Sequence, residues 1–109
     1  MYFLYYNTPN TRLEVNKTEY FVKWLKKLKD RQARIVIIDH IGRMEEGNLG
    51  NIKFVGNGIY EKKINYGPGY RLYFCQIGGI QLLLLGGGDK SAQRADIDKA
   101  REIKKELKL

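Results

Sequence analysis

The chain has 109 residues, of which 43% are apolar, so it is long enough for one core and too apolar for a disordered protein. Its single cysteine cannot close an internal disulfide, and no apolar run approaches the ~20 residues of a membrane-spanning helix. We therefore expect one soluble domain over residues 1–109 in the reducing cytoplasm, with no membrane partner.

Positive charge dominates the sequence, with 20 Lys+Arg against 12 Asp+Glu, a net charge of +8. The isoelectric point is about 9.6, and a value above ~9 is typical of proteins that bind nucleic acid. A basic surface that has no ligand, or an acidic protein partner, explains the charge equally well. The charge alone therefore does not identify the ligand.

The N-terminal part predicts a strand and a helix after a short extension. Residues 1–10 are interpreted as the extension, and residues 11–16 alternate apolar and polar side chains, as a strand does. Thr18 suits the N-cap of the helix. Apolar residues then recur at the spacing of one buried helix face, namely Phe21, Trp24, Leu25 and Leu28.

A second helix is predicted over residues 31–46, with Asp30 as its N-cap and Gly47 as its stop. Its inner face carries Ala33, Ile37, Ile41 and Met44. Because the link between the helices is short, we expect them to form a helical hairpin.

The second half of the chain predicts four strands and a last helix. The strands span 51–55, 59–65, 70–77 and 80–85 and are separated by glycine turns. Ser91 is the expected cap of the last helix. The result is an α+β fold: an N-terminal strand and a helical hairpin packed on a four- to five-stranded, mainly antiparallel sheet, plus a C-terminal helix.

Two features of the last strand stand out. Its run of four leucines, 82–85, needs cover on both faces, so the strand should be central in the sheet. The glycines 86–88 that follow lack the Gly-Lys-Ser/Thr ending of a phosphate loop. We interpret them as a hinge that needs backbone freedom and that presents Lys90.

The pleat of strand 70–77 puts Arg71 and Tyr73 on one face, opposite the apolar side chains that should meet the helices. Arg71 and Tyr73 are therefore expected on an open face. In the preceding strand, Glu61 and Lys63 should lie outward beside Arg71. This register places Lys62 on the inward side, so either Lys62 reaches the rim or the register is one residue off.

Such a cluster fits the chemistry of RNA cleavage without a metal ion or cofactor. Attack of a 2′-OH on phosphorus needs proton removal, stabilisation of the phosphorane and a proton for the departing 5′-oxygen. Arg71 can donate two parallel hydrogen bonds to phosphorane oxygens, and lysines can supply further charge. An aromatic ring such as that of Tyr70 or Tyr73 can stack a base.

Three segments resemble one known family. Residues 69–74, 87–91 and 95–100 read GYRLYF, GGDKS and ADIDKA. They look like the RelE/ParE toxin superfamily, and more narrowly its HigB-like addiction module killer branch. Trp24-Leu25 and the segments 30–34 and 48–51 also fit that branch. The resemblance covers most of the chain, roughly residues 13–103.

This resemblance implies the toxin of a type II toxin–antitoxin pair, held inactive by an antitoxin of helix-turn-helix type. Many members are metal-independent, ribosome-dependent mRNA endoribonucleases that block translation. Arg71 matches the arginine that contacts the scissile phosphate. Lys63 matches a basic residue on the preceding strand, and Lys90 a late cation before the last helix. We take these three as catalytic, and Lys53, Tyr73 and Glu61 as RNA contacts.

The sequence also departs from the RelE pattern. Residues 94–97 hold no tyrosine where RelE has one, and the only histidine, His40, falls in the second predicted helix. The general base therefore remains open, with Glu61 as the nearest carboxylate by register. Two alternatives stay open as well: a non-catalytic poison of DNA gyrase, as on the ParE side of the superfamily, and a degenerate toxin that acts only through antitoxin binding. In either toxin reading, we expect the antitoxin to cover the sheet face.

Overall fold

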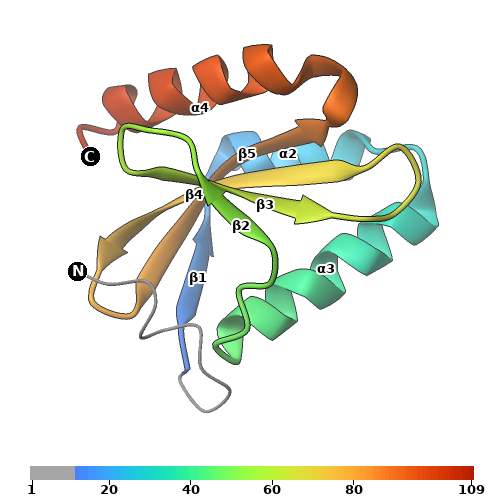
Figure 1. The fold of residues 1–109 in the computed structure, drawn as a ribbon, viewed down its shortest axis with the longest axis horizontal. Helices are drawn as coiled ribbons and strands as arrows, with labels where there is room; N and C mark the ends of the chain where they lie inside the picture. Colours follow the sequence, from blue (N-terminus) through green and yellow to red (C-terminus); the bar gives the residue numbers. More distant parts are fainter. Residues whose placement is uncertain (1–11) are drawn as a thin grey trace.

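The structure is a computed structural model that describes residues 12–109 (Figure 1). The predicted extension 1–10 lies outside these residues, as does the first residue of the predicted strand 11–16. The elements are β1 (Glu14–Lys17), α2 (Glu19–Lys27), α3 (Arg31–Glu45), β2 (Ile52–Phe54), β3 (Ile59–Ile64), β4 (Tyr70–Gly78), β5 (Gln81–Asp89), a 3-10 turn (Lys90–Ala92) and α4 (Gln93–Glu106). No helix within residues 12–109 is long and apolar enough to cross a membrane.

The five strands form one sheet in the order β1-β5-β4-β3-β2. β1 runs parallel to β5, and the other neighbours are antiparallel. This confirms the predicted α+β fold. β5 lies between β1 and β4, and its leucines enter separate cores on the two faces of the sheet: Leu82 and Leu84 in one, Leu85 in the other. The leucine run therefore has the two-sided cover that its sequence requires.

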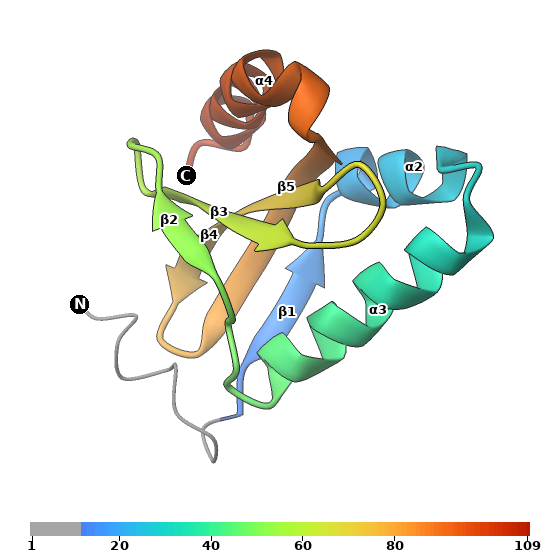
Figure 2. The same ribbon diagram turned by 45° about the vertical axis from the view of Figure 1, so that its right-hand side comes forward.

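Helices cover both faces of the sheet (Figure 2). The pair α2 and α3 packs on the face that carries Leu72 and Phe74. α4 packs on the opposite face, where Ala100 and Ile103 are buried in one cluster with Tyr73. The prediction of an open face is therefore wrong along α4. The physical reason is that the apolar stripe of α4 needs burial, and this face offers the remaining apolar surface of the sheet.

Side chains begin the helices as the sequence predicts, with one exception. Thr18 Oγ accepts a hydrogen bond from the backbone N of Phe21, at 3.1 Å. Asp30 Oδ1 accepts one from the backbone N of Ala33, at 3.2 Å. The last helix, however, begins after Ala92 without a side-chain cap, and Asp89 caps the preceding 3-10 turn, where its Oδ1 accepts from the backbone N of Ser91 at 2.8 Å. Ser91 itself lies in the 3-10 turn.

The glycines 86–88 are not a hinge, because β5 continues through them to Asp89. None of them has a positive φ angle. Two of them are needed for close packing: a Cβ on Gly87 would lie 2.5 Å from the Trp24 ring, and one on Gly88 would lie 1.9 Å from Asp96 Oδ2. The glycines therefore let α2 and α4 approach the strand.

Candidate nucleic-acid interface

The three predicted catalytic cations meet in one hollow, which we call the Arg71 hollow. It has a volume of about 290 Å³. Its lining consists of Lys63, Asn65, Tyr66, Gly67, Pro68, Gly69, Arg71 and Lys90. The hollow lies at the end of the sheet, where the β3–β4 turn meets the start of the 3-10 turn.

Backbone pairing brings these cations together. Lys63 on β3 and Arg71 on β4 are direct antiparallel partners, so their side chains leave the sheet on the same face. Lys90 joins them because its backbone N donates to the Gly69 carbonyl, at 3.0 Å. Lys63 and Lys90 are exposed. The hollow therefore presents one mostly buried cation, Arg71, and two solvent-exposed cations.

Arg71 is the mostly buried cation, with a side chain only 11% exposed. Its Nε lies 3.6 Å from Glu61 Oε2, which is an ion-pair distance but too long for a hydrogen bond. Nε and Nη1 are both buried and have no hydrogen-bond partner within residues 12–109. A buried donor without a partner is costly. Arg71 also lines the hollow, so its guanidinium charge acts on any anion that enters there.

Glu61 and Tyr73, predicted as RNA contacts, are instead internal. Glu61 is 5% exposed and Tyr73 is fully buried under α4. Glu61 Oε2 accepts hydrogen bonds from the Tyr73 hydroxyl, at 3.1 Å, and from Gln93 Nε2, at 2.7 Å. Burial, reinforced by the Glu61 charge, raises the pKa of the Tyr73 hydroxyl. Both residues are thus corrected to a supporting role: they fix the carboxylate that faces Arg71.

Two other sequence expectations concern side chains around the hollow. Lys53 lies opposite Glu61 on β2 and is exposed, but it does not line the hollow. Its role in RNA binding stays a prediction. Tyr66 lines the hollow and is half-buried, whereas the sequence predicted only a turn position for it. An aromatic residue in a glycine- and proline-rich turn was the signal that could have identified it.

The register of β3 is as predicted, and Lys62 points inward and stays buried rather than reaching the rim. Its partner is Leu72, on the face that α3 covers. Lys62 is 1% exposed, and its Nζ donates to the Leu49 carbonyl at 2.8 Å. It enters a second cavity of about 230 Å³, here called the Lys62 pocket. That pocket is lined by His40, Arg43, Asn48, Gly50, Asn51, Lys62, Lys63 and Asn65.

His40 lines this pocket and is not near the Arg71 hollow. Its Nδ1 is buried without a hydrogen-bond partner in the described part of the chain. Burial lowers the pKa of His40, and the charges of Lys62 and Arg43 lower it further. Both causes favour the neutral imidazole, which lies beside two cationic side chains.

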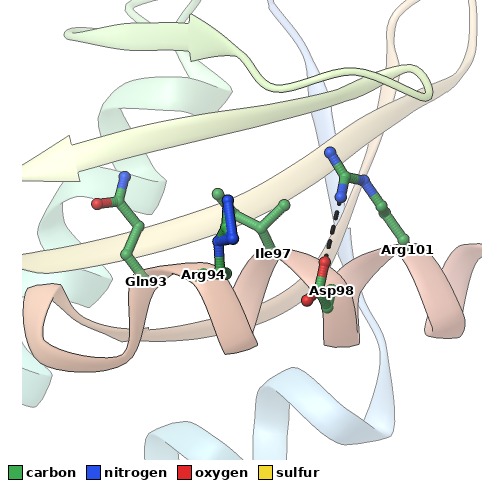
Figure 3. Close-up of a pocket in the computed structure, with 5 residues that line it drawn as sticks. All are labelled: Gln93, Arg94, Ile97, Asp98 and Arg101. Atoms are coloured by element: carbon green, nitrogen blue, oxygen red, sulfur yellow. Dashed lines mark hydrogen bonds and ion pairs between the residues drawn. The ribbon is translucent and has the colours of Figure 1, made fainter.

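A third cavity, of about 470 Å³, runs along α4. Its lining side chains rise from α4 toward the strands, as Figure 3 shows: Gln93, Arg94, Ile97, Asp98 and Arg101. Arg101 contacts Asp98 Oδ1 at 3.2 Å and donates to the Val55 carbonyl at 2.9 Å. Its two arginines extend the basic surface beyond the Arg71 hollow, and no sequence argument predicted this groove.

Comparisons with known proteins place the fold. No family model matches the chain. An uncharacterized protein of Haemophilus influenzae is 42% identical over 97 residues, which covers 89% of this chain and 98% of that protein. Among solved structures, a mutant of the Escherichia coli toxin RelE in the free state matches with a TM-score of 0.68 at 19% identity, covering 84% of this chain and 97% of that one.

The toxin–antitoxin complex RelBE2 of Mycobacterium tuberculosis matches with a TM-score of 0.57 at 19% identity, over 73% of this chain and 100% of the matched one. The HigB-like branch remains a prediction, since neither structural match is specific to it. The chain therefore belongs to one family with the Haemophilus influenzae protein and has the RelE-like fold.

Proposed function

We propose that this chain is the toxin of a type II toxin–antitoxin pair and that it blocks translation by cutting mRNA on the ribosome, without a metal ion, in the cytoplasm. The observation that carries the proposal is the Arg71 hollow: three cations converge there, and two buried nitrogens of Arg71 have no hydrogen-bond partner within residues 12–109. Likeness to a toxin structure and to a toxin–antitoxin complex supports it.

In the proposed reaction, the 2′-hydroxyl of the RNA gives its proton to water, its oxygen attacks the adjacent phosphorus, and the bond to the 5′-oxygen breaks. The products are a 2′,3′-cyclic phosphate and a free 5′-hydroxyl. Arg71 and Lys63 stabilise the negative charge of the phosphorane. One such donor contributes roughly 2.7–4 kcal/mol to the transition state. Lys90 neutralises or protonates the departing oxygen.

Two neighbours assist in this proposal. Glu61 holds the guanidinium of Arg71 in place and is itself fixed by Tyr73 and Gln93. Tyr66 replaces Tyr73 as the ring that stacks a base, a contact of ~1–3 kcal/mol. The lining of the hollow contains no carboxylate and no histidine within the described residues. Electrostatic stabilisation is therefore the main catalytic contribution that we assign.

A purified sample added to a translation extract tests the proposal. Primer extension should reveal new 5′ ends on the mRNA that depend on the ribosome. Uncut mRNA at saturating protein would contradict it. A Lys105→Ala variant is a suitable control, because Lys105 is an exposed residue of α4 that lines none of the three cavities.

A second candidate is a non-catalytic poison of DNA gyrase, which is favoured because no acid or histidine among residues 12–109 lines the hollow. A supercoiling assay separates the two, since only the poison leads to accumulation of cleaved DNA complexes while mRNA stays whole. If neither effect occurs and expression leaves growth unchanged, the chain acts through antitoxin binding alone.

The antitoxin, which we propose to be of helix-turn-helix type, must bring acceptors to the Arg71 hollow. Covering Arg71 and Lys63 without acceptors would bury unpaired charge, which is costly. We therefore expect acidic side chains of the antitoxin at this hollow. A crystal structure of the complex in which the hollow stays open would contradict this expectation.

A further inference from the structure

The Lys62 pocket contains a buried ammonium group that the proposed cleavage does not use. Lys62 is 1% exposed, and the Leu49 carbonyl accepts from its Nζ at 2.8 Å. An ammonium group has three donors, whereas this carbonyl is a neutral acceptor. Lys62 is therefore held in the protein without a counter-charge from its hydrogen-bond partner.

The groups around Lys62 add positive charge. Arg43 and His40 face it from α3, and Lys63 lines the same pocket from β3. No carboxylate belongs to the lining among residues 12–109. Asp39 instead pairs with Arg43, at 2.7 Å, where both side chains are more than half exposed. Burial and the charge of Arg43 lower the pKa of Lys62 to about 8.

Neutral donors complete the pocket. The side-chain amides of Asn48, Asn51 and Asn65 each carry an NH2 group that can donate to an oxyanion. The volume of about 230 Å³ has room for one tetrahedral oxyanion with several water molecules. A pocket with buried positive charge, amide donors and no carboxylate matches the chemistry of a phosphate group.

We propose that the Lys62 pocket binds a phosphate group, with Lys62 and Arg43 as its charged ligands. Two sources share this chemistry: free inorganic phosphate and the backbone of a nucleic acid strand. Lys63 and Asn65 line both the Lys62 pocket and the Arg71 hollow, so the two cavities are adjacent. A strand can therefore place one phosphate at Arg71 and a neighbouring phosphate at Lys62, and this second part rests on the proposed function.

Inorganic phosphate tests the site by itself. In wild-type protein with ¹³C-labelled lysine, the Cε resonance of Lys62 reports its pKa by NMR. Phosphate should raise that pKa above its value in chloride at matched ionic strength, because a bound anion favours the charged ammonium. An unchanged pKa at saturating phosphate would overturn the proposal.

Thermal unfolding provides the second readout. Phosphate should raise the melting temperature of wild-type protein by several degrees, because it binds only the folded state. The Lys62→Met variant should lose this shift, and the matched Lys105→Met variant should keep it. An equal shift in all three proteins would place the bound phosphate elsewhere and contradict the proposal. If Lys62→Met fails to fold, the NMR titration of the wild type decides.

A short single-stranded DNA tests the strand as source, because it has phosphates but no 2′-OH to be cut. The slope of log affinity against log salt should fall by about 0.7 in Lys62→Met, the value for one lost phosphate contact in a single strand. An unchanged slope would reject the strand as source while the phosphate titration still tests the pocket. The failure of the wild-type protein to cut mRNA would contradict the proposed function but not the phosphate site.

Discussion

The Arg71 hollow and the Lys62 pocket show two ways of holding a cation on consecutive strands of one sheet. Arg71 lies on the face that α4 covers and has a carboxylate, Glu61, at 3.6 Å. Lys62 lies on the face that α3 covers, and its Nζ donates to a neutral acceptor, the Leu49 carbonyl, at 2.8 Å. The paired cation is positioned in advance at moderate cost, whereas the unpaired one weakens the fold until a ligand arrives.

The largest effect is expected from removing Arg71, the buried cation of the hollow. Arg71→Ala should lower the rate of mRNA cleavage by about 10²–10³, because two donors to the phosphorane are lost. Arg71→Lys should recover only part of this rate, since a lysine lacks the planar fork of donors. The measurement is the rate of appearance of new 5′ ends in the translation extract. A wild-type rate in Arg71→Ala would remove Arg71 from the mechanism.

The next prediction removes the counter-charge of Arg71. Glu61→Gln should lower the free energy of unfolding by about 3 kcal/mol, because it leaves a mostly buried guanidinium without its ion-pair partner. It should also lower the cleavage rate, since Arg71 loses its fixed position. Urea unfolding measures the stability. A stability within experimental error of the wild type would mean that Glu61 does not restrain Arg71.

For Lys62, the comparison predicts that removing the charge stabilises the protein rather than destabilising it. Lys62→Met should raise the free energy of unfolding by about 2 kcal/mol at pH 7, because it replaces a buried unpaired charge by an apolar chain of similar length. If this variant is less stable than the wild type, Lys62 has a counter-charge that the fold alone does not reveal, and the contrast with Arg71 fails.

The same residue predicts how stability depends on pH. The pKa of Lys62 is about 8 in the folded protein and 10.5 in its ordinary state. Between these values the unfolded chain binds more protons, so stability should rise with pH from about 8 to 10.5. Below pH 8 both states are charged and the full cost is present. Lys62→Met should lose this rise in urea unfolding measured across that range.

The smallest effect is expected where Gly88 of β5 packs against Asp96 of α4. Gly88→Ala should destabilise the protein by about 1–2 kcal/mol, because the new Cβ would lie 1.9 Å from Asp96 Oδ2 and 2.7 Å from Asp96 Cγ, so the Asp96 side chain must move. Gly86→Ala is the matched control, since its Cβ meets nothing within 4 Å. Equal melting temperatures for the two variants would show that the Asp96 side chain moves there without cost.

Local signals made much of the fold predictable. Thr18 and Asp30 cap the helices where the sequence places them. The pleat gave the pairing of Lys63 with Arg71, and this pairing brought the predicted cations together. These features depend on neighbours in the chain or on a strand pair joined by a short turn, which is why sequence patterns reveal them.

The errors concern contacts between distant segments. The apolar stripe of α4 requires burial but does not say which face of the sheet supplies it, so Tyr73 was expected in the open. The glycines 87 and 88 were misread because their neighbours, Trp24 and Asp96, lie on helices elsewhere in the chain. The Lys62 pocket likewise needs α3 and the β2–β3 hairpin together. The one sequence feature that pointed to this pocket was the inward position of the charged residue Lys62 in the predicted strand.

The parallel pairing of β1 with β5 has a consequence for the order of events during synthesis. Thr18 Oγ donates to the Leu84 carbonyl, 66 residues away in the chain. The sheet therefore cannot close until β5 has emerged from the ribosome, and such distant pairing folds slowly. The face of β4 that carries Tyr73 gains the cover of α4 only after β5 has joined the sheet.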